Sequence, residues 1–242
     1  MMKSLFCTFF MVGAGIVSVW AQASPSSSEE KLKLGAEADA AVVTKYLWRG
    51  QRLTDDWSLQ PSGSVSLGSF SINVWGNLDL AAVNEGDVLL ISENPASTPG
   101  NSRGLQGKFS EVDYTFSYQM AAQDASIEFG SIFYTFPDRS ASLPSTVELF
   151  GGIALETVPL SPAFTIYVDV DETRDDSGDM GLYFQFGASH AFTLGHPRFP
   201  AVDLSGWISF VNEGFSEFYY GAANRGVHDV NVTLTLPIQW TE

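Results

Sequence analysis

Cysteine is almost absent from this 242-residue chain. The single one, Cys7, lies in an N-terminal segment with Lys3 near its start, an apolar run from 5 to 20, and the small-x-small ending "AQA" at 21–23. This pattern is typical of a secretory signal, and the apolar run is short of the roughly 20 residues that a membrane helix needs. We therefore expect 1–23 to be a signal peptide. The mature chain would then have no disulfide, no thiol nucleophile and no cysteine-ligated zinc.

Charge is scarce as well, and cations most of all. Only 17% of the residues are charged, with 12 Lys and Arg against 28 Asp and Glu, which gives a net charge of −16. Phosphate backbones require a basic surface, so we expect no nucleic acid as a partner. An ordinary soluble domain carries about 25% charged residues. Much of this surface should therefore meet something other than water.

Sequence motifs for catalysis, metal binding or nucleotide binding are missing too. No glycine-rich phosphate loop precedes a helix, and the three histidines, at 190, 196 and 228, have no paired spacing for a metal. The acidic stretch 169–179 offers oxygen ligands for Ca²⁺ but lacks EF-hand spacing, which favours a solvated loop. A barrel lipid enzyme would need a serine beside a histidine, and no serine stands out. We expect no enzyme, catalytic residue, metal or cofactor.

What the chain does have is period-two alternation, after a short polar segment at 24–35. In 70–80, for example, Phe70, Ile72 and Val74 alternate with Ser71 and Asn73. About ten such segments of about nine to twelve residues occur, a length that suits a tilted membrane strand better than a globular one. Their polar faces are mostly small and uncharged, as in a wet barrel interior, and their apolar faces are large and aromatic, as against lipid.

These segments are joined by connections that should alternate between short and long, as in outer-membrane barrels. The first ones do so: 50–57, then 68–69, then 81–108, then 121–124. We therefore predict an all-β fold, a transmembrane antiparallel up-and-down β-barrel over 36–242 with about ten strands. Twelve is the alternative, because the run 215–222, assigned to a loop, could form another hairpin.

The first predicted strand contains "AVVTKYLWRGQ", at 41–51, in which two cations interrupt an apolar run. Lys45 and Arg49 share the odd parity of Glu37 and Asp39, so we expect them to face the lumen, Arg49 near the outer rim. There they would face acidic side chains across the lumen, and the two sets of opposite charge would create an electric field across the pore that orients solutes. The predicted lumen acids are Asp79, Glu111, Asp113 and Glu128.

The alternative is that these cations only neutralise acids in ion pairs and plug a narrow barrel. Ten strands is closer to the filled eight-stranded barrels than to porins with aqueous channels. Large side chains on the lumen parity favour this alternative. They are Trp75, Tyr134, Phe150, Tyr183 and Trp207.

Tyr46, Arg49 and Gly50 also resemble the Tyr-x-x-Arg-Gly signature in the first strand of the TorF-type porin family, predicted outer-membrane barrels of Gram-negative bacteria. Further similarity lies in "VWGNLDL" and "EVDYTFSY", so the resemblance covers about the first half of the mature chain. It implies an outer-membrane β-barrel with a pore role.

Together these observations predict a porin-like barrel in the outer membrane of a Gram-negative bacterium, with membrane lipid and small solutes as its partners. Passive diffusion with a preference for cations is the expected function. One alternative is a non-conducting structural or adhesive barrel that acts through its extracellular loops, above all 81–108. Another is a soluble lipid carrier with its apolar face turned inward.

Overall fold

A computed structural model of the protein describes residues 6–9, 34–54, 56–81, 106–122, 124–137, 145–171 and 180–239. Most of them lie in strands, as predicted. The strands are β1 (Phe6–Phe9), β2 (Leu34–Val43), β3 (Tyr46–Trp48), β4 (Gln51–Thr54), β5 (Ser58–Leu67), β6 (Phe70–Asp79), β7 (Phe109–Ala122), β8 (Ala125–Thr135), β9 (Thr146–Leu155), β10 (Ala163–Asp169), β11 (Leu182–His196), β12 (Phe199–Val211) and β13 (Gly226–Gln239). One helix, α1 (Glu213–Tyr220), lies between β12 and β13.

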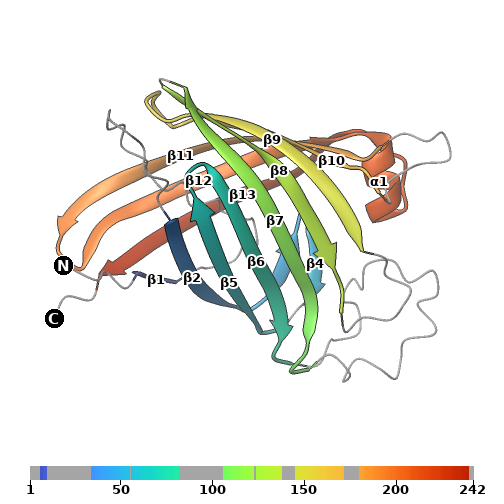
Figure 1. The fold of residues 1–242 in the computed structure, drawn as a ribbon, viewed down its shortest axis with the longest axis horizontal. Coiled ribbons are helices and arrows are strands. Elements are labelled where there is room, and N and C mark those ends of the chain that lie inside the picture. Colours follow the sequence, from blue (N-terminus) through green and yellow to red (C-terminus); the bar gives the residue numbers. More distant parts are fainter. Residues whose placement is uncertain are drawn as a thin grey trace.

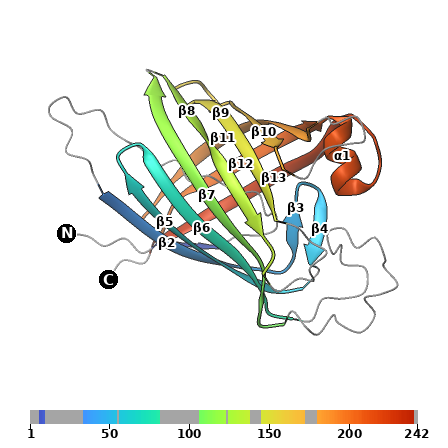
Figure 2. The same cartoon turned by 45° about the vertical axis from the view of Figure 1, so that its right-hand side comes forward.

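Eleven of the strands form one antiparallel sheet in the order β1-β13-β12-β11-β10-β9-β8-β7-β6-β5-β2. Apart from β1 and the separate pair β3-β4, each strand pairs with the next strand of the sheet along the chain. This is the predicted up-and-down topology. The strands are long and tilted, and the sheet curls so that β5–β8 lie in front of β11–β13 in the second view (Figures 1 and 2). β1 falls within the predicted signal peptide, so ten strands of the sheet belong to the predicted mature chain.

The two faces of the sheet are chemically opposite. The outer face carries exposed large apolar side chains along almost every strand, such as Ile72 and Val74 on β6 and Val230 and Val232 on β13. The inner face buries polar groups, such as Asn77. This is the reverse of a soluble domain, in which apolar residues fill the core. The predicted parity of these strands is confirmed.

Connections alternate in length more regularly than the sequence indicated. At one end of the sheet they are 68–69, 123–124, 156–162 and 197–198, and at the other 44–57, 80–108, 136–145, 170–181 and 212–225. β11 ends at His196 and β12 begins at Phe199, so the connection between them has only two residues. One end of the sheet therefore has short turns, and the other has all the long connections.

The prediction of a single strand that continues from 41 to 49 is wrong. β2 ends at Val43, the chain bends at residues 44–45, and β3 and β4 then form a separate two-stranded hairpin. Arg49 and Gly50 occupy its turn with φ of 43° and 80°, and positive φ at both central residues is the mark of a type I′ turn. The hairpin folds into the interior, where Leu53 is fully buried.

The run 215–222 is neither an open loop nor a hairpin, because most of it belongs to α1. Asn212 caps the helix by accepting a hydrogen bond from the Phe215 backbone N–H at 3.0 Å, and Gly221 ends it in the left-handed conformation. Phe215 and Tyr219, four residues apart, point from one face of the helix into the interior. None of the helical structure in the described ranges is long and apolar enough to cross a membrane.

Candidate functional site

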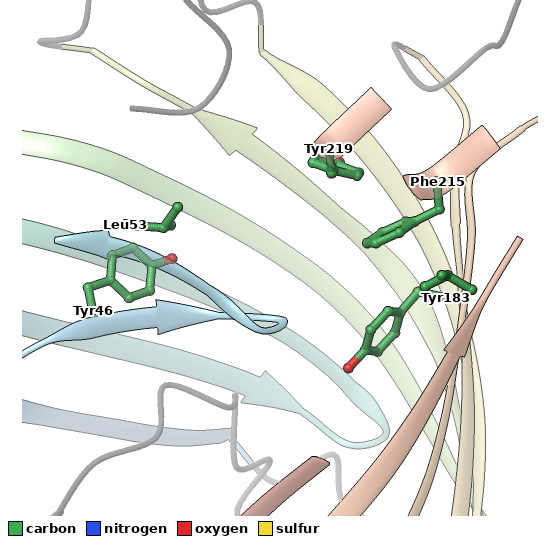
Figure 3. Packing of buried hydrophobic residues seen from close by; sticks show 6 residues of the cluster. Tyr46, Leu53, Tyr183, Phe215 and Tyr219 are labelled. Atoms are coloured by element: carbon green, nitrogen blue, oxygen red, sulfur yellow. The ribbon is translucent and has the colours of Figure 1, made fainter. Parts of the chain in front are cut away.

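The hairpin and the helix meet inside the curled sheet, at the end with the long connections. We call residues 46–54 and 213–221 together the plug. Figure 3 shows Tyr46 and Leu53 of the hairpin on one side, Phe215 and Tyr219 of the helix on the other, and Tyr183 reaching in from the sheet. These residues form the one buried apolar cluster found among the described residues. This buried apolar cluster therefore joins the plug to the wall.

Arg49, at the tip of the hairpin, forms a two-point ion pair with Glu148 of β9. Its Nη1 lies 2.5 Å from Glu148 Oε1 and its Nη2 lies 2.8 Å from Oε2. The side chains are 9% and 1% exposed, respectively. Tyr134 of β8 adds a hydrogen bond to the same carboxylate, its hydroxyl donating to Oε2 at 2.7 Å. Charge-assisted bonds in this fork geometry are among the strongest that side chains make.

Aromatic rings surround the guanidinium. Its Cζ atom lies 4.3 Å from the ring centroid of Tyr183, 4.6 Å from that of Tyr167 and 4.7 Å from that of Trp48, with Phe215 at 5.5 Å. All four distances are within the range of cation–π attraction, which is stronger when the cation is desolvated. The carboxylate and the rings thus form a cage that matches both the charge and the planar faces of the guanidinium.

Hydrogen bonds join the two halves of the plug, the hairpin and the helix. Gln51 Nε2 donates to the Tyr219 carbonyl oxygen at 2.8 Å, and the Tyr220 hydroxyl donates to the Arg49 carbonyl oxygen. His228 of β13 joins them, its Nε2 lying 2.7 Å from the Tyr220 hydroxyl and 3.1 Å from the Arg49 carbonyl oxygen. The hairpin and the helix are therefore held as one unit.

The helix is also bonded to the wall. The Tyr219 hydroxyl donates to Asp169 Oδ2 at 2.8 Å, and Thr146 donates to the same carboxylate. Burial raises the pKa of Tyr219 above its ordinary value and that of Tyr220 to about 12. Both hydroxyls therefore remain protonated donors at neutral pH.

The sequence prediction placed six residues in the lumen, and the structure brings most of them to the interior. Asp79, Glu111 and Asp113 are buried on the inner face of β6 and β7, and Glu128 is half-buried on β8. Lys45 is exposed at the bend after β2, so its predicted position on a lumen-facing strand is wrong.

Arg49 does reach the interior, but on the hairpin tip and not on a barrel strand near the rim. It pairs with Glu148, and not with any of the four predicted acids. Glu148 lies two residues before Phe150, which is predicted to face the lumen, so the same parity would have predicted Glu148 on the inner face. Asp169 and Asp229 were also missed as wall acceptors; Asp229 accepts from Tyr183, Trp207 and Ser209.

A second polar network lines the inner face of β5, β6 and β7. Gln60 Nε2 donates to Asn77 Oδ1 at 2.9 Å, and Asn77 Nδ2 donates to Asp79 Oδ1 at 2.8 Å and to the Ser110 hydroxyl at 2.9 Å. The interior as a whole is acidic. Its buried carboxylates are Asp79, Glu111, Asp113, Glu148 and Asp169, and Arg49 brings a positive charge to one of them, Glu148.

A pocket of about 530 Å³ opens beside the plug, lined by Gly50, Gln51 and Arg52 of the hairpin and by residues 217–221 of the helix. Within the ranges that the structure covers, no group of three or more His, Asp or Glu side chains could hold a metal ion. Most of the acidic stretch 169–179 and of the connection 81–108 lies outside the described residues.

Comparison with known proteins adds no relative: no family model matches the chain, and neither the curated proteins nor the solved structures contain a match. The Tyr-x-x-Arg-Gly residues, which carry the resemblance to the TorF-type porins, fall on the plug hairpin and its turn.

Proposed function

We propose that the mature chain is an outer-membrane β-barrel for small, preferably cationic solutes, and that the plug holds it closed at rest. The observation that carries the proposal is the two-point ion pair of Arg49 with Glu148, which fixes the hairpin tip to the inner wall.

The outer face supports membrane embedding. On β13 the outward row Val230, Val232 and Leu234 is 67%, 68% and 60% exposed. Fully burying one such side chain is worth about 1.5–3 kcal/mol, and soluble monomers rarely leave large contiguous apolar patches in water. A hydrocarbon environment removes this cost for every strand of the sheet, and the short turns at one end and long connections at the other are typical of outer-membrane barrels.

The edges of the sheet support closure into a barrel. The two edge strands are β2 and β1, and β1 covers only Leu236–Gln239 of β13. If the signal peptide is removed, the outer edge of β13 loses this partner. Unpaired strand edges cannot persist in hydrocarbon, so β13 would pair with β2 and leave ten strands.

The interior supports a cation preference combined with a closed resting state. Acidic side chains lining a pore attract cations, and the buried carboxylates lie on the inner face. The plug fills the same space near the end with the long connections. Solutes would pass when the hairpin leaves the wall, which requires that the Arg49–Glu148 pair separate.

Planar bilayer recordings of refolded protein test this proposal. Wild type should be closed for most of the time, and Arg49→Ala should give frequent, cation-selective openings, because the hairpin has lost its anchor. Arg198→Ala is the matched control, since Arg198 is exposed in the short turn at the opposite end of the sheet; it should behave as wild type does. A folded Arg49→Ala protein that never conducts would reject the channel.

That result would favour a second candidate, a non-conducting structural or adhesive barrel. The observation that supports it is the filling of the interior, to which Trp75 also contributes by packing against Tyr46 at 5.6 Å between ring centroids. Deleting most of the connection 80–108 would then abolish surface binding while leaving the fold in place. In the channel, the same deletion would leave conduction intact.

A further inference from the structure

The cage around Arg49 is built almost entirely from residues outside the hairpin. Glu148 and Tyr134 come from β9 and β8, Tyr167 and Tyr183 from β10 and β11, and only the Trp48 ring comes from the hairpin. Phe215 of α1 completes it. If the hairpin moved away, the carboxylate and the rings of Tyr167 and Tyr183 would remain at the site, and Phe215 would remain with them as long as α1 keeps its hydrogen bond from Tyr219 to Asp169 of the wall. Glu148 would then be a buried charge without its partner, which is unfavourable.

The geometry of this cage is selective. The carboxylate accepts two parallel N–H bonds from one cation, and the rings contact the face of a planar group. An ammonium is a compact point charge that cannot form the fork or stack on rings in the same way. The Tyr134 hydroxyl, which donates to Glu148 Oε2, fixes the orientation of the carboxylate for this fork.

We propose that Glu148, Tyr134, Tyr167, Tyr183 and Phe215 form a binding site for solutes that carry a guanidinium group, and that Arg49 occupies it as an internal ligand. Free solutes of this class bind when they replace Arg49. The site itself does not depend on conduction; that its occupation by a solute releases the hairpin and opens the barrel rests on the proposed function.

Arg49 is covalently part of the chain, and this attachment determines how strongly it competes with a free guanidinium compound for the site. A group held on a short linker acts at an effective concentration in the millimolar range, and here the hairpin is held further by its bonds to α1. A free ligand must overcome this advantage in wild type but not in a chain without Arg49. Removing Arg49 should therefore tighten the binding of a free guanidinium compound at least about tenfold.

The experiment uses methylguanidinium chloride as the probe and methylammonium chloride as the matched cation, with the refolded full-length barrel in detergent. Calorimetry and the thermal unfolding midpoint both report binding without any conduction. Methylguanidinium should bind Arg49→Ala at least tenfold more tightly than wild type and raise its unfolding midpoint, whereas methylammonium should do neither. Arg49→Ala combined with Glu148→Gln should lose the response.

Arg49→Lys provides a second route if Arg49→Ala does not fold, because the lysine keeps a cation beside Glu148 but fills the cage poorly. Its affinity for methylguanidinium should lie above that of wild type, and Glu148→Gln should again remove binding. Equal responses to the two cations, equal binding to wild type and variants, or no binding to a folded variant would each overturn the site.

Bilayer recordings of wild type with methylguanidinium separate the site from the channel. Binding in detergent with silent bilayers keeps the site and rejects conduction. Openings of Arg49→Ala without any binding of methylguanidinium keep the channel and reject the site.

Discussion

Breaking the Arg49–Glu148 pair from each side, and then from both, is the sharpest test of how the plug is held. Arg49→Ala leaves Glu148, whose side chain is 1% exposed, without its positive partner. Removing one partner of a buried ion pair lowers the free energy of unfolding by about 3–5 kcal/mol. Glu148→Gln removes the opposite charge and leaves the guanidinium among the rings, where cation–π attraction offsets part of the loss, so about 2–4 kcal/mol is expected.

The double variant should lose no more than the larger single loss, because neither buried charge is then left without its partner. Urea unfolding from detergent micelles, followed by tryptophan fluorescence, gives the four free energies of this cycle. Guanidinium salts are avoided as denaturants because they resemble the proposed ligand. Losses that simply add in the double variant would refute the ion pair as the anchor of the plug.

Three further predictions concern the turn, the outer face and the helix. Gly50→Ala should lower the unfolding free energy by about 1–2 kcal/mol in urea, because φ of 80° strains an L-residue and the new Cβ would lie 3.4 Å from that of Asp229; an unchanged midpoint would contradict the type I′ turn. Val232→Lys should slow or reduce folding into lipid vesicles at a cost of about 2–4 kcal/mol if its site is near the bilayer midplane, whereas a soluble sheet would tolerate the change. The Tyr220 pKa is raised from 10.0 to about 12, so its contribution to stability is fully present below pH 10 and is lost as the pH rises toward 12; Tyr220→Phe should flatten urea midpoints over that range.

The strands from β5 to β13 could be predicted from the sequence because the alternation that defines each of them is a local pattern. A side chain's parity decides which face it occupies, and a one-residue slip would reverse every face at once. By this rule the sequence predicts Asp79, Glu111 and Asp113 on the inner face, where the structure has them buried. The same rule would have placed Glu148 there.

The plug could not be read in this way. All four charged residues from Glu37 to Arg49 share one parity, as in a single strand, yet the chain bends at residues 44–45 and reverses at Arg49 and Gly50. The glycine was a local sign of a turn, but the direction in which the hairpin folds depends on Glu148 and on rings more than 80 residues away. The helix had its own local signs in the sequence: a capping Asn212, the terminal Gly221, and aromatic residues at the helical spacing of 215, 218 and 219.

Single-channel recording of Arg49→Ala beside wild type tests the central claim most directly, namely that one buried ion pair keeps a membrane barrel closed. The account predicts that wild type opens rarely, that Arg49→Ala opens often with cation selectivity, and that Arg198→Ala matches wild type. Equal conductance in all three proteins, or silence in a correctly folded Arg49→Ala protein, would contradict it.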